Sequence, residues 1–161
     1  MSILPRLLAG FCLASLTVHA AVVRVEITDR SDVAKSDYEI LTGKLHFEID
    51  PKLSQNAIIA DVGLAPVNAA GKVSFTADLR LWRPKDESHS NGAAWVEIPN
   101  RGGKASLSEW VMKAGFTLVS VGWEFDVAAD KLRLEVPRAQ KKDGSPIRGV
   151  VSAVFTPDKR L

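Results

Sequence analysis

Cysteine is almost absent from this sequence, since Cys12 is the only one among 161 residues. A disulfide scaffold needs many more cysteines, and a strongly disordered chain has fewer apolar residues or a larger charge imbalance than 21 Lys and Arg against 19 Asp and Glu. The formal net charge of +2 gives no electrostatic reason to expect nucleic acid as a partner. With 46% hydrophobic and 25% charged residues, the composition predicts one globular domain.

The longest apolar stretch, residues 7–18, lies at the start of the chain and follows a short segment that carries Arg6. Small residues precede the bond between Ala20 and Ala21, and this combination is typical of a secretory signal peptide. A membrane anchor is the alternative, but a spanning helix needs about 20 apolar residues and polar residues interrupt this run. We expect residues 1–20 to be cleaved, with export to the periplasm or the extracellular medium and no membrane attachment afterwards.

The histidines and the cysteine predict no metal site. Signal cleavage would remove Cys12, so the mature residues 21–161 would have no thiol for a disulfide, a nucleophile or a metal. His46 alternates with charged residues and is expected on a strand surface, while His89 lies in a loop with only two carboxylates close in sequence. We therefore expect neither a metal nor a cofactor.

Apolar and polar residues alternate over much of the mature chain, with the period of two that marks a half-buried strand. The alternating segments are 22–28, 43–50, 73–82, 132–136 and 149–155. The polar residues 29–42 are expected to form a loop. These segments predict antiparallel β-structure.

Two apolar runs without alternation, 93–98 and 116–122, predict a buried pair of parallel strands. Between them Ser106 and Glu109 have the spacing of a capping box, and Gly115 follows the apolar stripe of a helix. The fold class is therefore predicted as α/β and β-rich, with antiparallel strands followed by one βαβ crossover.

The four tryptophans divide by pattern. Trp95 and Trp110 are expected in the core, because one lies in an apolar run and the other on the apolar stripe of the helix. Trp82 and Trp123 lie at strand ends, where an amphipathic ring could line a pocket.

The loop after the first apolar run is the strongest candidate site, because ligands of open α/β sheets bind at the carboxyl ends of parallel strands. It consists of Asn100, Arg101, Gly102 and Gly103. The two glycines would let the backbone approach a ligand, or would only make a tight turn. Trp123, Glu124 and Asp126 follow the second run and are expected at the same edge, as ligand contacts or as solvated side chains. The glycine spacing fits neither a phosphate loop nor a dinucleotide fingerprint.

Several short motifs combine into a family resemblance. They are Val25-Glu26-Ile27-Thr28-Asp29-Arg30-Ser31-Asp32-Val33, Tyr38-Glu39 ahead of Gly43, Leu64-Ala65-Pro66-Val67-Asn68, Phe75-Thr76-Ala77-Asp78, Arg83-Pro84-Lys85-Asp86, Asn100-Arg101-Gly102, and Gly122-Trp123 with Asp126. In this combination the chain resembles a bacterial family of exported alpha/beta hydrolase domain proteins of unsettled substrate. The resemblance implies ester hydrolysis by a serine nucleophile, a small-molecule ester substrate, and an oxyanion loop at residues 100–103.

The chain departs from that family at the nucleophile. The elbow Gly-x-Ser-x-Gly is absent, and its nearest approximation, around Ser120, lacks the first glycine and lies inside a predicted strand. Neither His46 nor His89 is placed to be the base, so no catalytic residue is identified. We expect residues 21–161 to be the amino-terminal segment of an esterase-like hydrolase, incomplete and inactive alone. The alternative is a small exported β-rich binding module without catalysis.

Overall fold

A computed structural model describes residues 20–103, 105, 107–150 and 152. The predicted signal peptide lies outside these residues, so its cleavage stays a prediction. Most of the predicted strand 149–155 lies outside them as well, and the described residues Gly149 and Val150 belong to no strand. Within the described ranges, no helix is both long enough and apolar enough to cross a membrane.

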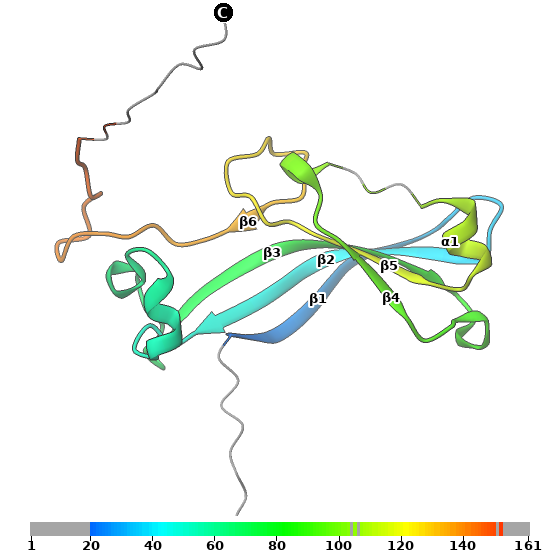
Figure 1. Cartoon of the computed structure of the whole chain (residues 1–161), viewed down its shortest axis with the longest axis horizontal. Helices are drawn as coiled ribbons and strands as arrows, with labels where there is room; N and C mark the ends of the chain where they lie inside the picture. The colour runs from blue at the N-terminus through cyan, green and yellow to red at the C-terminus, as the bar shows by residue number, and fades with distance from the viewer. Residues whose placement is uncertain (1–19, 104, 106, 151, 153–161) are drawn as a thin grey trace, which may run out of the picture.

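The fold is β-rich and is built on one mixed sheet of six strands (Figure 1). The strands are β1 (Ala20–Asp32), β2 (Tyr38–Ile49), β3 (Val73–Pro84), β4 (Ala94–Glu97), β5 (Thr117–Val121) and β6 (Leu134–Glu135). Their order is β1-β2-β3-β5-β4, and β6 pairs with β3. The helical elements are short: α1 (Glu109–Lys113) and the 3-10 turns η1 (Ser54–Ile58), η2 (Val62–Leu64), η3 (Glu87–His89) and η4 (Asn100–Gly102).

The first three strands are longer than predicted, whereas β6 occupies only two residues of the predicted segment 132–136. β1 pairs with β2 from Ala20 opposite Ile49 to Asp32 opposite Glu39, and β2 pairs with β3 along its whole length. The predicted loop 29–42 is therefore wrong, since only residues 33–37 connect β1 to β2. β1 is an edge strand whose side chains can stay in solvent, so its polar end needs no apolar alternation to remain in the sheet.

The parallel pairing of the two apolar runs is present, but the predicted burial of the first is wrong. β4 and β5 run parallel, from Ala94 opposite Thr117 to Glu97 opposite Ser120, and α1 lies between them in sequence. β4 is the other edge of the sheet, and its Val96 side chain is 60% exposed. An apolar run shows that a strand can be covered, but not which element covers it.

The predicted helix is present in shortened form. Ser108 is its N-cap, without a side-chain cap hydrogen bond, and the Ser106 proposed for this role lies outside the described residues. Only Val111 is buried in α1. Gly115, with φ of 73°, follows the helix as predicted, because glycine adopts the left-handed conformation without a Cβ clash.

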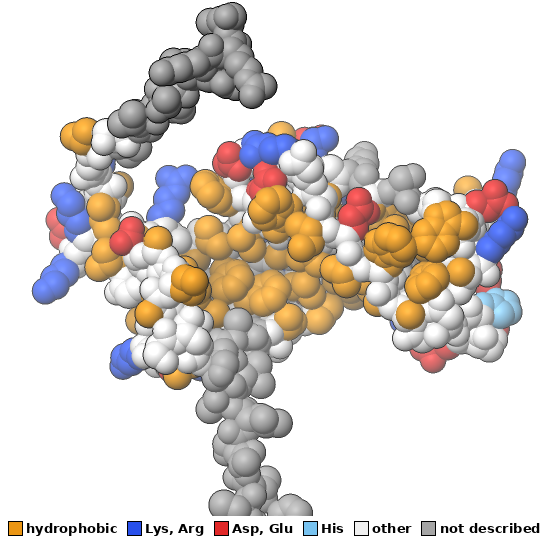
Figure 2. All heavy atoms as spheres, in the orientation of Figure 1, with side chains coloured by type: hydrophobic (Ala, Val, Ile, Leu, Met, Phe, Trp, Pro, Cys, Tyr) orange, Lys and Arg blue, Asp and Glu red, His pale blue; other side chains and the backbone are white. Residues whose placement is uncertain are grey.

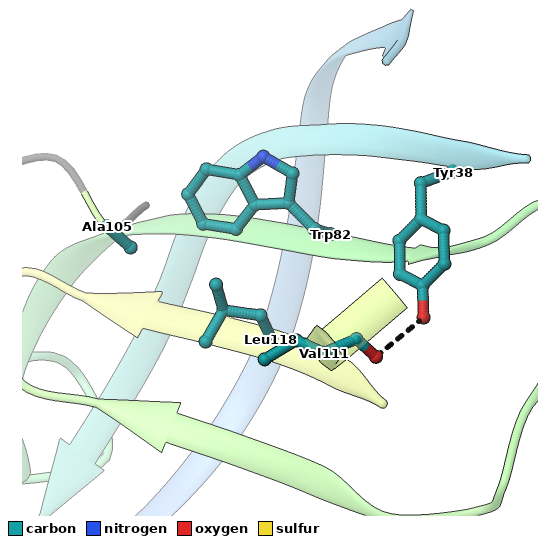
Figure 3. Packing of buried hydrophobic residues seen from close by; sticks show 5 residues of the cluster. All are labelled: Tyr38, Trp82, Ala105, Val111 and Leu118. Carbon is teal, nitrogen blue, oxygen red and sulfur yellow. Dashed lines mark hydrogen bonds between the residues drawn. The ribbon is translucent and has the colours of Figure 1, made fainter. Parts of the chain in front are cut away.

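The main core cluster lies where α1 packs against the sheet (Figure 3). Its buried members come from β2, β3, α1, β5 and the segment before the helix: Tyr38, Trp82, Ala105, Val111 and Leu118. The Tyr38 hydroxyl donates a hydrogen bond to the Phe116 carbonyl at 2.9 Å, which ties β2 to the connection between α1 and β5. Burial raises the pKa of this phenol, so it stays protonated and keeps donating.

Three of the four tryptophan predictions are wrong. Trp82 is buried in the core, with 6% of its surface exposed, because its strand end is the part of β3 covered by α1. Trp95 and Trp110 are about half exposed, at 48% and 53%, and pack edge to face with ring centroids 5.3 Å apart. Trp123 lies two residues beyond the end of β5 and is half exposed, and its role in lining a pocket stays a prediction.

The antiparallel strands have one charged face and one apolar face. On the charged face Lys44 Nζ lies 3.2 Å from Asp78 Oδ1 and 2.9 Å from Glu135 Oε1. On the other face Phe47 and Phe75 are opposite one another and stack with centroids 4.9 Å apart. Figure 2 shows hydrophobic side chains gathered over the middle of this sheet. The apolar face is thus only partly covered.

The loop before β4 is attached to the turn between β1 and β2 by a titratable pair. His89 Nδ1 and the Asp37 carboxylate form a hydrogen bond, which raises the pKa of His89. The folded-state pKa lies above the ordinary value near 6.5, so the pair stabilises the fold fully below about pH 6.5 and stops doing so as the pH rises through the raised pKa. We expect NMR titration to give His89 a higher pKa in the parent chain than in Asp37→Asn. Equal values in the two proteins would contradict this attachment.

Candidate functional site

The candidate loop forms a tight turn directly after β4. Arg101 and Gly102 have φ of 52° and 63°, so both lie in the left-handed region, and the Gly103 amide donates to the Asn100 carbonyl at 3.1 Å. A non-glycine residue is uncommon in this region and is retained there when its contacts hold it.

Gly102 is held between this turn and a later loop. A Cβ at this position would contact the Leu132 carbonyl oxygen and lie 2.8 Å from Lys131 Cβ, and the Leu132 amide donates to the Gly102 carbonyl at 3.2 Å. Gly103 is different, because a Cβ there would meet only the Asn100 carbonyl oxygen, at 3.2 Å. Of the two adjacent glycines, one therefore requires glycine, and the other would take a Cβ with a shift of only a few tenths of an ångström.

Arg101 joins the loop after β4 to the segment after β5. Its Nη1 lies 2.8 Å from Glu124 Oε2 and 2.8 Å from Asp126 Oδ1, and its Nη2 donates to the Asp126 carbonyl at 3.0 Å. The Arg101 amide also donates to Glu124 Oε1, at 3.1 Å. The hydrogen bond that Arg101 donates to Asp126, followed by the charge of that carboxylate, raises the pKa of Arg101. The structure thus brings together the residues that the strand ends predicted to be neighbours, and we call this arrangement the Arg101 clamp.

The clamp uses backbone donors that an oxyanion loop would offer to a ligand. The amide of Arg101 donates to Glu124, and that of Gly103 donates to Asn100. An oxyanion would reach the first of these amides only after the Glu124 carboxylate moves aside. Residues 100–103 could therefore act as oxyanion donors only if the Glu124 side chain, which is mostly buried, changed its position.

Trp123 forms the outer wall of this edge. Its Nε1–H donates to the Pro99 carbonyl at 2.8 Å, and half of its surface stays exposed. The following Phe125 is 61% exposed. Of the two predicted pocket residues, Asp126 is thus part of the Arg101 clamp, whereas Trp123 is bound to Pro99 and keeps an exposed indole ring that a ligand could contact.

A cavity that the sequence did not predict lies beside Gly102. It has a volume of about 240 Å³ and lies between the charged face of the sheet and the loop of residues 129–132. The lining residues are Thr28, Thr42, Gly43, Lys44, Asp78, Arg80, Gly102, Ala129, Asp130, Lys131 and Leu132. Because they come from three strands and two distant loops, no local pattern joins them. The available signal was Arg80, a cation in the middle of a long strand.

Ser120 is enclosed within β5, as predicted from its position inside an apolar run. None of its surface is exposed, and its Oγ has no hydrogen-bond partner. A nucleophilic serine must be exposed on a turn with a base beside it, and this hydroxyl meets neither requirement. Among the residues that the structure describes, no cluster of three or more His, Cys, Asp or Glu side chains could hold a metal ion.

The Arg101 clamp predicts that loss of the Arg101 guanidinium loosens the backbone only locally. In Arg101→Gln we expect faster amide hydrogen exchange in residues 99–103 and 123–126, because the contacts to Glu124 and Asp126 are lost. Global stability should stay close to that of the parent chain, since the guanidinium is more than half exposed and the pairs are screened. Exchange rates identical to those of the parent chain would contradict the clamp, and Arg148→Gln is the control for loss of one exposed arginine.

Comparison with known proteins gave no relative: no family model, no curated protein and no solved structure matches this chain.

Proposed function

We propose that this chain belongs to an exported, esterase-like hydrolase and supplies the ligand-facing loop of its site, while the nucleophile and base come from outside these 161 residues. The observation that carries the proposal is the Arg101 clamp, which joins the loop after β4 to the segment after β5. These are the carboxyl ends of two parallel strands, where open α/β sheets bind ligands. The resemblance in sequence motifs supports the same class, with a small-molecule ester as substrate.

The described residues support the absence of turnover by the chain alone. His46 Nε2 lies 2.8 Å from Glu26 Oε2, and His89 pairs with Asp37, so each imidazole has a carboxylate partner. Neither imidazole hydrogen-bonds to a serine hydroxyl within the described part of the chain, and Ser120 is enclosed. A Ser-His-acid relay needs all three groups in contact.

The test of this proposal is an esterase assay on the 161-residue chain with p-nitrophenyl butyrate, combined with a fluorophosphonate probe that labels activated serines. We expect no turnover above the buffer rate and no labelled serine, with Ser120→Ala identical to the parent. Turnover that Ser120→Ala abolishes would show that the chain carries its own nucleophile.

A non-catalytic binding module is the second candidate, and the edges of the sheet favour it. β1 and β4 both lie at edges, and their exposed apolar side chains include Val25 at 54% and Val96 at 60%. Exposed apolar edge strands promote pairing with another polypeptide. A monodisperse monomer in sedimentation experiments that unfolds cooperatively on heating would favour the binding module. Self-association would favour the hydrolase segment, whose sheet needs further strands.

A further inference from the structure

Arg80 lies in the cavity beside Gly102 without a partner for its charge. In β3 it stands opposite Thr42 of β2 and Ser120 of β5, and it is only partly exposed. No hydrogen bond or ion pair joins its guanidinium to any other described residue. A guanidinium has five N–H donors, and none of those of Arg80 is used by a described residue. The fold therefore retains at this point a cation that it does not itself neutralise.

The other charged residues of the cavity are already compensated. Lys44 lies between Asp78 and Glu135, and the second Asp78 oxygen accepts the Arg133 amide hydrogen at 2.9 Å. Lys131 lies 3.7 Å from Asp130. The lining thus carries three cations against the two carboxylates Asp78 and Asp130, and Arg80 is the cation for which no ion pair with a described residue is found.

A second unsatisfied polar group stands next to Arg80. Side chains directly opposite one another on antiparallel strands lie on the same face, so Ser120 shares the face of Arg80. The Ser120 Oγ is buried and has no partner. Buried polar atoms without partners are uncommon, and each calls for an explanation such as a ligand or water. Ser120 itself does not line the cavity, so Arg80 is the group there that a ligand with an acceptor would meet.

We propose that this cavity binds the carboxylate of a small organic acid through Arg80. A guanidinium can bind a carboxylate through two parallel, charge-assisted hydrogen bonds, a bidentate pair. A phosphate dianion fits less well, since one free cation cannot balance two negative charges beside Asp78 and Asp130. The volume of about 240 Å³ is below the roughly 300 to 1,000 Å³ of drug-sized ligand sites, which limits the ligand to a short acid. The inference rests on the proposed function and assigns the ligand as the acid product or a carboxylate-bearing ester.

The test is a binding titration of the 161-residue chain with butyrate, followed by the NMR signals of arginine Nε–H groups and of backbone amides. Butyrate should shift the Arg80 signal and the amides of Thr42 and Gly102. Arg80→Gln should weaken the affinity at least tenfold, and Arg80→Lys should fall between it and the parent. Arg148→Gln, which removes an exposed arginine outside the cavity, should bind as the parent does. Melting curves and amide spectra of each variant establish that it is folded. If Arg80→Gln does not fold, the loss of affinity in Arg80→Lys tests the inference instead.

Three results would overturn the inference: no saturable shift with butyrate, equal weakening by Arg148→Gln, or tighter binding of inorganic phosphate than of butyrate. Methyl butyrate, which has the same chain without the charge, should not shift the Arg80 signal. Binding of butyrate requires no turnover, so a negative titration would reject the carboxylate site without deciding whether the chain belongs to a hydrolase.

Discussion

Trp82→Ala is expected to lower the free energy of unfolding by about 3 to 5 kcal/mol, the usual cost of truncating a buried large aromatic side chain. Trp82 is 6% exposed and lies in the cluster with Tyr38 and Leu118, where β2, β3, β5 and α1 meet. Removal of the indole leaves a cavity in the cluster where the helix packs against the sheet. Urea denaturation followed by circular dichroism measures the change.

The matched control is Trp110→Ala, which removes the same indole from the exposed side of α1. Trp110 is 53% exposed and contacts Trp95 and Phe116 edge to face. Such aromatic contacts contribute about 0.5 to 1.5 kcal/mol each beyond the area they bury. We therefore expect a loss clearly smaller than that of Trp82→Ala. If Trp110→Ala lowered the free energy of unfolding more than Trp82→Ala, Trp110 would be the core residue, as the sequence pattern predicted, and the observed core would be contradicted.

Gly102→Ala is expected to have the second large effect, because two independent constraints act on this residue. Its φ of 63° is unfavourable for alanine, and the new Cβ would contact the backbone of Leu132, which cannot rotate away. Overpacking of this kind costs about 1 to 3 kcal/mol, here with the backbone strain in addition. The loop 129–132 must move, so the cavity and the Arg101 clamp should both loosen. Thermal unfolding and the fluorescence of Trp123 report the two effects.

Gly103→Ala is the control for Gly102→Ala, since it makes the same change one residue later. Gly103 has φ of −57°, and an added Cβ meets only the Asn100 carbonyl oxygen, at 3.2 Å. Stability and Trp123 fluorescence should stay close to those of the parent chain. Equal effects from both substitutions would show that the loop as a whole resists change and that the contact with Leu132 is not the cause.

The strands were predictable from sequence because alternation and apolar runs are local signals. Residues 73–82 alternate and β3 forms there, and the two apolar runs became the parallel pair β4 and β5. The wrong predictions concern which side chains are buried by other elements of the fold. Trp95 looked buried and Trp82 looked peripheral because burial depends on which distant element packs on a strand, and a pattern within one strand contains no record of that.

The candidate site was predictable only in outline. The rule that the carboxyl ends of parallel strands share an edge correctly placed Arg101 beside Glu124 and Asp126. The clamp itself, in which an amide of the loop donates to Glu124, depends on the left-handed conformation of Arg101 and could not be predicted. The cavity at Arg80 was missed, since its walls are separated by many residues along the chain.

The most direct test of the central claim is to sequence the DNA that follows the codon for Leu161 and to translate it in all frames. The claim is that these residues form the ligand-facing part of an esterase whose nucleophile is encoded elsewhere. We predict a downstream Gly-x-Ser-x-Gly segment between an apolar strand and a helix, followed by a histidine, since that elbow is what a serine hydrolase sheet requires. Downstream DNA that encodes no such segment would contradict the hydrolase assignment and leave the binding module as the function of this chain.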